Sequence, residues 1–125
     1  MKMSVLRRVD PWAPPLALMA VIFILSAQPS LDSGLGVADL VGRKLVHFGV
    51  YALLCFLWWR AFVTGTDSGR AALAAFLVAS AYAVSDEIHQ SFVEGRHGAA
   101  LDWAIDTAGA AVVAIRVRSR RRAVV

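Results

Sequence analysis

The stretch Ala71-Ala-Leu-Ala-Ala-Phe-Leu-Val-Ala-Ser-Ala-Tyr-Ala-Val-Ser85 contains no charged residue, and Asp86-Glu87-Ile88-His89-Gln90 follows it directly. At the α-helical rise of about 1.5 Å per residue, the uncharged part covers only about three-quarters of a bilayer. Polar residues must therefore complete the span. Because charged side chains at membrane depth are costly and persist where they are paired, hydrated or used, this segment predicts a transmembrane helix with a functional site at one end.

Three further apolar segments accompany this one in a chain of 125 residues, of which 58% are hydrophobic. This composition leaves too little polar surface to cover a water-soluble domain. Glycines cluster between the segments, as is typical of loops. We therefore predict an all-α fold: one domain over residues 1–125 that forms a four-helix transmembrane bundle. The expected helices lie at about 12–30, 44–63, 71–93 and 99–117, followed by a basic tail at 118–125.

The first segment has two possible interpretations. The run from Pro11 to Leu31 is uncharged and long enough to span a bilayer, with Trp12 placed as an interfacial anchor. A cleavable signal peptide would also have a basic start and a small-residue ending. Pro14 and Pro15 at the helix entrance, and the need of the later segments for a fourth packing partner, favour a retained membrane helix.

The distribution of positive charge predicts the orientation. Ten of the 13 lysines and arginines lie near the chain ends or in the Arg60 to Arg70 connection, and the other three are Arg43, Lys44 and Arg96. Lysine and arginine accumulate on the cytoplasmic side of membrane proteins. Both termini are therefore expected in the cytoplasm, and the polar ends of the helices are expected to face the extracytoplasmic side of the membrane.

The composition also argues against two classes of function. The net charge of +4 comes from residues that flank apolar segments, so no nucleic-acid partner is expected. Cys55 is the single cysteine, which excludes a disulfide framework or a cysteine-based metal site within one chain.

Polar residues at helical spacing form one stripe on each of the last three segments. The stripes are Lys44, His47 and Tyr51; Tyr82, Asp86 and Gln90, with Glu87 beside them; and Asp102, Asp106 and Gly109. Residues three or four apart share a helix face. If these faces meet, basic donors, an imidazole and several carboxylates gather in a polar cavity near the outer membrane surface.

Such a group of side chains permits three kinds of chemistry. A histidine oriented by a carboxylate acts as a general base or nucleophile, while Lys44 and Arg96 can bind a phosphate. Alternatively His47, His89 and the carboxylates can bind a divalent metal, although no His-x-x-x-His pair is present. A proton pathway is a third use, but the inner halves of these segments offer no polar route.

The chain resembles the VanZ-like family of small bacterial membrane proteins, named for a teicoplanin-resistance accessory protein. The resemblance covers about four-fifths of the chain and lies in three motifs: Ser26-Ala27-Gln28-Pro29, Lys44-x-x-His47-Phe48-x-x-Tyr51, and the element from Asp86-Glu87-x-x-Gln90 through Gly95-Arg96 to Asp102. Two positions differ from the family pattern. Glu94 stands where proline is common, and Asp106 stands where asparagine is usual and adds a negative charge.

The resemblance implies a four-helix membrane domain of the bacterial inner membrane with a role in modifying lipid head groups or lipid-linked cell-wall intermediates. Together with the polar residues listed above, it leads to our hypothesis of an enzyme that acts on a phosphate-containing lipid head group or a lipid-linked cell-wall intermediate by transfer or hydrolysis at the outer leaflet. The alternative is a non-catalytic accessory protein that binds a lipid or a glycopeptide in antibiotic resistance. The expected partner is a membrane lipid or lipid-linked intermediate, and no cofactor is predicted beyond a possible divalent metal.

Ten residues are predicted to form the site. In this hypothesis His47 is the base or nucleophile, Asp86 or Glu87 orients it, and Asp102 positions the substrate. The substrate-binding residues are Gln28, Lys44, Tyr51, Gln90, Arg96 and Asp106.

Overall fold

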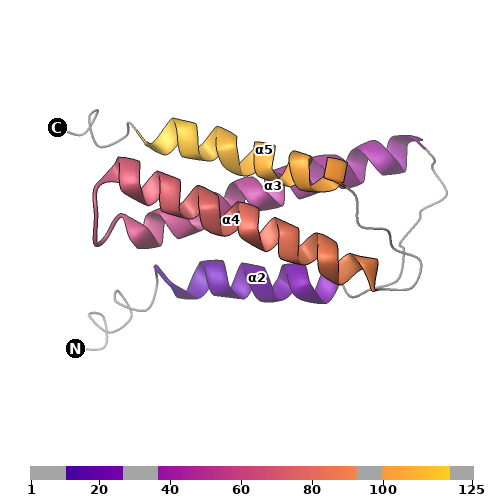
Figure 1. Cartoon of the computed structure of the whole chain (residues 1–125), viewed down its shortest axis with the longest axis horizontal. Coiled ribbons are helices and arrows are strands. Elements are labelled where there is room, and N and C mark those ends of the chain that lie inside the picture. The colour runs from indigo at the N-terminus through magenta and orange to yellow at the C-terminus, as the bar shows by residue number, and fades with distance from the viewer. Residues whose placement is uncertain (1–10, 27–36, 93–99, 119–125) are drawn as a thin grey trace.

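The computed structural model of the chain describes residues 11–26, 37–92 and 100–118. Within these ranges the fold is all-helical, with four helices and no strand (Figure 1). This confirms the predicted all-α class. The helices are α2 (Ala13–Ser26), α3 (Val37–Phe62), α4 (Ser68–Ser91) and α5 (Ala100–Val117).

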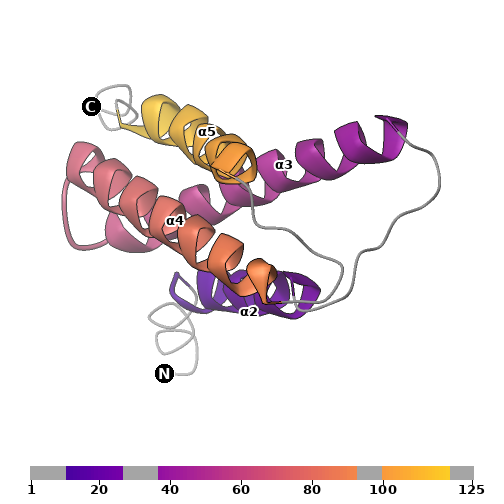
Figure 2. The same ribbon diagram turned by 45° about the vertical axis from the view of Figure 1, so that its right-hand side comes forward.

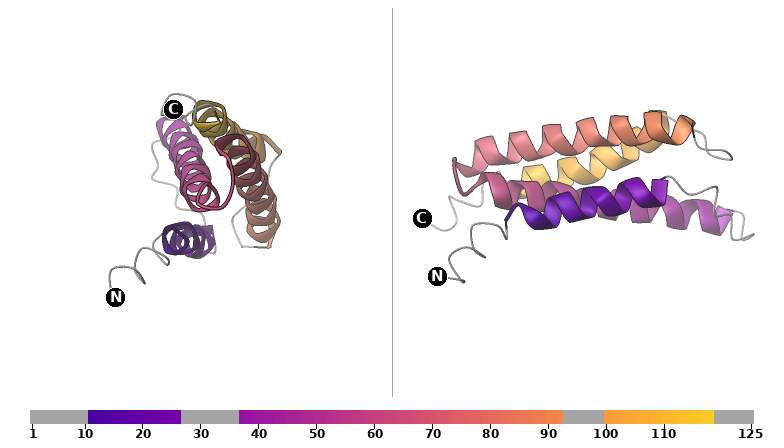
Figure 3. Two further views of the ribbon diagram at one scale, coloured as in Figure 1. Left: turned by 90° about the vertical axis from the view of Figure 1, so that its left-hand side faces the viewer. Right: turned by 90° about the horizontal axis from the view of Figure 1, so that it is seen from below.

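The helices alternate in direction along the chain, so that α3 and α5 run parallel to each other and opposite to α2 and α4 (Figure 1). The first residues of α2 and the last residues of α5 consequently lie at the same end of the bundle. Helices α3, α4 and α5 make the most extensive contacts with one another. Figures 2 and 3 show α2 placed along one side of this group, against α3 and α4.

Two helices begin earlier than their apolar cores indicate. Helix α4 starts at Ser68, because the side chain of Asp67 accepts the backbone N–H of Arg70 at 2.8 Å and caps the helix. Helix α3 starts at Val37, ahead of the expected 44, and its first turns project beyond the other helices (Figure 1). Helix α2 ends at Ser26, and the expected continuation to 30 lies outside the described residues.

Small residues make the interior of the bundle. The buried face of α4 consists of alanines at helical spacing and continues into polar residues: Ala72, Ala75, Ala79, Ala83, Asp86 and Gln90. Small side chains allow helix backbones to approach closely. The buried alanines pack with Tyr51, Leu54 and Cys55 of α3 and Ala110 of α5. Helix α4 is therefore apolar along most of its inner face and polar at one end.

At the other end of the bundle, one serine connects three helices. Ser68 at the start of α4 donates a hydrogen bond to the carbonyl oxygen of Val117 in α5. Its hydroxyl also accepts the indole N–H of Trp59 in α3, at 3.2 Å. These bonds join the ends of α3 and α5 to the start of α4.

By length and composition, two described helical segments are sufficiently apolar to cross a membrane, Val41–Phe62 and Ser68–Ser91. Helix α2 is apolar but has 14 residues, and α5 carries Asp102, Asp106 and Arg116. Large apolar side chains on all four helices point outward; they include Phe23, Leu45, Leu73 and Ile115.

Candidate functional site

The three predicted polar stripes meet where α3 begins, α4 ends and α5 begins. Each stripe contributes polar side chains here: the half-buried His47 from α3, the buried Asp86 and Gln90 from α4, and the buried Asp106 from α5. Their positions follow from the parallel course of α3 and α5. Three successive contacts keep these two helices in one register: Lys44 with Asp102, His47 with Asp106, and Phe48 with Gly109.

The central contact joins His47 and Asp106. The Nδ1 atom of His47 lies 3.2 Å from Oδ1 of Asp106, whose side chain is fully buried. When the proton is on Nδ1, His47 donates it to Asp106 and retains the lone pair of Nε2. A carboxylate in this position fixes the orientation of the ring and its tautomer. The structure thus gives the orienting contact to Asp106, which the sequence analysis placed among the substrate-binding residues.

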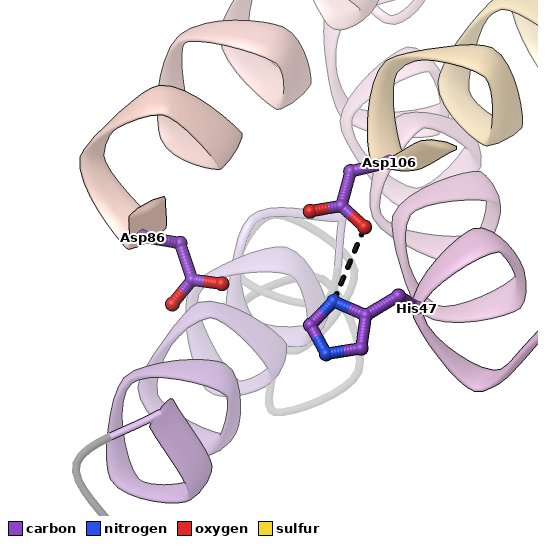
Figure 4. Close-up of side chains that lie close together, drawn as sticks. All are labelled: His47, Asp86 and Asp106. Carbon is purple, nitrogen blue, oxygen red and sulfur yellow. Dashed lines mark hydrogen bonds and ion pairs between the residues drawn. The ribbon is translucent and has the colours of Figure 1, made fainter. Parts of the chain in front are cut away.

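Asp86 approaches the pair from the opposite side. Figure 4 shows its carboxylate directed from α4 toward the space beside His47 and Asp106. One possible ligand atom from each of the three side chains lies within 4.8 Å of the others. Helices α3, α4 and α5 therefore place one imidazole and two buried carboxylates around a common point.

Lys44 forms an ion pair one helical turn before His47. Its Nζ atom donates to Oδ1 of Asp102 at 2.7 Å, and the two side chains are 29% and 30% exposed. Lys44 is the predicted phosphate-binding residue and Asp102 the predicted positioning residue, and the structure joins the two in one ion pair. Asp102 holds the ammonium group at the rim of the site, where it remains accessible.

A small pocket of about 90 Å³ opens beside His47, between α2, α3 and α4. Its lining is mainly apolar with three polar side chains: Ile22, Leu25, Val46, Val50, His47, Tyr51 and Gln90. Leu25 and Val46 are also exposed on the outside of the bundle, which places apolar side chains at the rim. The pocket therefore joins the polar site to the apolar outer surface.

The hydroxyl group of Tyr51 is buried beside this pocket. The residue is 1% exposed, and its Oη atom has no well-aligned hydrogen bond among the described residues, although the carboxylate of Asp86 lies within reach. Asp86 is close enough to interact with it electrostatically. A buried hydroxyl whose hydrogen bond is poorly aligned can also bond to a ligand or a water molecule in the pocket.

The remaining predicted site residues lie around this centre or outside the described ranges. Glu87 is half-buried and follows Asp86 on α4. Gln28 and Arg96 lie outside the described residues.

Contacts with α2 were not foreseen from the sequence. His89 stacks on Phe23 with ring centroids 4.4 Å apart, and Tyr82 donates to the carbonyl oxygen of Met19 at 2.5 Å. These two contacts attach α2 to α4. Apolar segments carry no sequence pattern that identifies a stacking partner on another helix.

The family model described as VanZ/LLP1 matches residues 12–119. No curated protein and no solved structure matches the chain. The matched range includes all four described helices and the complete cluster of His47, Asp86 and Asp106.

Proposed function

The chain belongs to the VanZ/LLP1 family, and from the arrangement of its site we propose that it is an integral membrane enzyme. It modifies a phosphate-containing lipid head group or a lipid-linked cell-wall intermediate, by transfer or hydrolysis, at the outer leaflet of the bacterial inner membrane. The observation that carries this proposal is His47, which contacts the buried Asp106 and lines a pocket whose rim is apolar.

The distribution of side chains supports a membrane location for all four helices. Buried positions are occupied by alanines and by polar residues such as Asp86 and Asp106, whereas exposed positions carry large apolar residues such as Leu45, Leu73 and Ile115. Soluble monomers rarely expose apolar surface of this extent. Small residues at helix contacts and apolar residues outside are typical of bundles that are surrounded by lipid.

The charges at the two ends of the bundle support the orientation. Arg60, Arg70, Arg116 and Arg118 lie at the end where α3 and α5 terminate and α4 begins. The cluster around His47 lies toward the opposite end. If the arginine-rich end is cytoplasmic, the site faces the outer leaflet.

The pocket supports an amphiphilic substrate. An apolar rim formed by Leu25 and Val46 suits an acyl chain, and the polar side chains His47, Tyr51 and Gln90 suit the head group. A lipid can thus reach the site sideways from the bilayer. Lys44, held by Asp102, supplies a positive charge that can bind a phosphate oxygen by a charge-assisted hydrogen bond.

In this mechanism His47 acts as the general base. Nε2 accepts the proton of the attacking water or hydroxyl group while the oxygen forms its bond to phosphorus. The bond between phosphorus and the leaving oxygen then breaks, and His47 returns the proton to that oxygen. Asp106 holds the ring in position and stabilises the positive charge that His47 carries between the two steps.

A direct test uses the full chain in lipid nanodiscs with a total bacterial lipid extract. Mass spectrometry of the lipids before and after incubation is expected to show a new head-group species with the unaltered protein and none with His47→Ala. His89→Ala is the matched control, because His89 stacks on Phe23 outside the cluster. Unaltered lipids that copurify with the protein would overturn the enzymatic proposal and support the accessory binding function. Equal turnover by His47→Ala would overturn the role of His47.

A further inference from the structure

A second hollow lies toward the end of the bundle that is opposite to His47. It is a groove of about 320 Å³ between α4 and α5, and it is larger than the pocket beside His47. Sites that hold small-molecule ligands have volumes of about 300–1,000 Å³. The lining includes residues with the same helical spacing on the two helices: Gly69, Ala72 and Phe76 of α4, and Ala111, Ala114 and Arg118 of α5. The groove therefore follows both helices for about two turns.

One end of the groove is charged and the rest is apolar. Helix α4 begins and α5 terminates at the arginine-rich end of the bundle (Figure 1), so Arg118 lies at the same end as Gly69. Phe76 and Ala111 lie two turns further in. At about 1.5 Å per residue, the distance along α5 from Ala111 to Arg118 is about 10 Å, and one leaflet of the hydrocarbon core is about 15 Å thick. The groove thus extends from the membrane surface through most of one leaflet.

The sides of the groove are apolar and face outward from the bundle. Leu73 and Ile115 line it, and they are 60% and 58% exposed. Near the charged end, the hydrogen bond from Ser68 to the carbonyl oxygen of Val117 holds the start of α4 against the end of α5. An acyl chain can therefore enter from the bilayer without separating the two helices.

The guanidinium group of Arg118 is available to bind an anion. Arg118 is exposed and forms no ion pair with any residue that the structure describes. Arg70, in contrast, pairs with Asp67 at 3.5 Å. A guanidinium group can bind a phosphate group through two parallel hydrogen bonds. A positive charge above an apolar groove is complementary to a lipid with an anionic head group.

We propose that this groove binds one anionic phospholipid of the cytoplasmic leaflet, such as phosphatidylglycerol. Its acyl chain lies along Ala72 and Ala114, and its phosphate binds to Arg118. Basic pockets between transmembrane helices on the cytoplasmic side typically bind anionic head groups. This site is separate from the pocket at His47. The inference rests on the membrane location and orientation in the proposed function, and it does not depend on the proposed chemistry.

The charge of Arg118 argues against a second copy of the chain as the occupant. Copies in one membrane have the same orientation, so a two-fold dimer through this groove would bring both Arg118 side chains to the same end. Like charges that meet at an interface weaken it. An anionic lipid neutralises the same charge.

The experiment measures lipid binding to the full chain in detergent by native mass spectrometry. The chain is titrated with phosphatidylglycerol and, separately, with phosphatidylcholine that has the same acyl chains. One phosphatidylglycerol per chain should bind about tenfold more tightly than phosphatidylcholine, and Arg118→Gln should abolish this preference. Water-soluble glycerol phosphate should not displace the lipid, because it lacks the acyl chains. Circular dichroism verifies that the variant is folded.

Arg116→Gln is the matched control. It removes the same charge from an exposed position two residues earlier in α5, outside the groove, so it should bind phosphatidylglycerol as the unaltered chain does. Equal affinity of the unaltered chain for the two lipids would overturn the site. An equal loss in Arg116→Gln and Arg118→Gln would show that only the overall charge matters, and would overturn it too. A dimer of the unaltered chain that binds no lipid would assign the groove to a second copy.

Labelling of Arg118→Cys tests the leaflet. Cys55 is buried, so a maleimide that cannot cross membranes should report on position 118. Labelling in inverted membrane vesicles and not in right-side-out vesicles is expected, and the reverse pattern would overturn the cytoplasmic assignment. Because the lipid titration involves no turnover, its failure would leave the enzymatic proposal intact. One phosphatidylglycerol bound through Arg118, with all lipids chemically unaltered, would support this site and overturn the enzymatic proposal.

Discussion

Gly109 of α5 lies so close to α3 that a β-carbon at this position would be 2.2 Å from the carbonyl oxygen of Phe48. This is the closest approach that a side chain at 109 would face, and the obstacle is backbone. The absence of a side chain at Gly109 therefore sets the distance between the two helices. One turn away, the same approach brings His47 to 3.2 Å from Asp106.

Gly109→Ala should destabilise the bundle and impair the site. Because the Phe48 carbonyl cannot rotate away, the added methyl group must push α3 and α5 apart. Overpacking of this kind costs about 1–3 kcal/mol. We expect a lower melting temperature in detergent and reduced turnover, since the separation of His47 and Asp106 increases.

Gly49→Ala provides the control for this substitution. A β-carbon at Gly49 meets no atom within 4 Å, and alanine is the better helix former by about 1 kcal/mol. Gly49→Ala should therefore be as stable as the unaltered chain or more so. Equal melting temperatures for the two variants would contradict the close packing at Gly109.

The sequence was sufficient to predict the all-α class and which polar residues share a helix face. Uncharged runs such as Ala71 to Ser85 identify helices by composition, and helical spacing assigns each residue to a face. The residues at which the helices begin are harder to predict from the sequence. The capping residue Asp67 is polar and lies in a segment with the composition of a loop, so the sequence predicts a start at 71, three residues after the observed start at Ser68.

The partner of each polar residue depends on how two helices are aligned, and this was not available from spacing alone. The sequence places Asp86, Glu87, Asp102 and Asp106 near one another without ranking them as partners of His47. In the structure the contact of Gly109 with Phe48 fixes the alignment, and Asp106 becomes the partner. Packing between small residues determines such alignments, and it leaves no charge or polarity pattern in the sequence.

Lys44→Gln and Asp102→Asn should affect catalysis differently, although they remove the same ion pair. Partly exposed pairs contribute about 0.2–1 kcal/mol, so both variants should remain folded. If Lys44 binds the lipid phosphate, its loss should raise KM about tenfold, which corresponds to about 1.4 kcal/mol. Asp102→Asn leaves the ammonium group in place and should change KM much less. Steady-state kinetics of both variants measure this difference, and identical KM values would show that the pair is only structural.

Ser68→Ala should destabilise the end of the bundle opposite to the site. The hydroxyl group serves Trp59 and Val117 at once, and its removal leaves a buried donor and a buried acceptor without a partner. Such a loss costs about 1–3 kcal/mol. Thermal unfolding measures it. Ser91→Ala is the control, because Ser91 is exposed and donates to the carbonyl of Ile88 in its own helix. A control variant that is equally destabilised would contradict the special role of Ser68.

Tyr51→Phe and Tyr82→Phe should have opposite effects on stability and activity. The hydroxyl of Tyr51 is buried beside the carboxylate of Asp86 and has no well-aligned hydrogen bond among the described residues, so its removal should change stability by no more than about 1 kcal/mol. The same hydroxyl is placed beside the pocket with His47 and Gln90. If it bonds to the substrate, Tyr51→Phe should reduce kcat/KM about tenfold, the equivalent of about 1.4 kcal/mol.

In Tyr82 the hydroxyl has a structural use, because it donates to the carbonyl oxygen of Met19 at 2.5 Å and holds α2 against α4. Its removal should cost about 0.5–1.5 kcal/mol of stability. Turnover should stay close to that of the unaltered chain, since this contact lies outside the cluster. Melting temperature and kcat/KM are measured for both variants. Tyr51→Phe should lower kcat/KM and leave the melting temperature nearly unchanged, whereas Tyr82→Phe should lower the melting temperature and leave kcat/KM nearly unchanged. A Tyr51→Phe variant that is destabilised yet fully active would mean that its hydroxyl supports the fold, and that the substrate does not reach it.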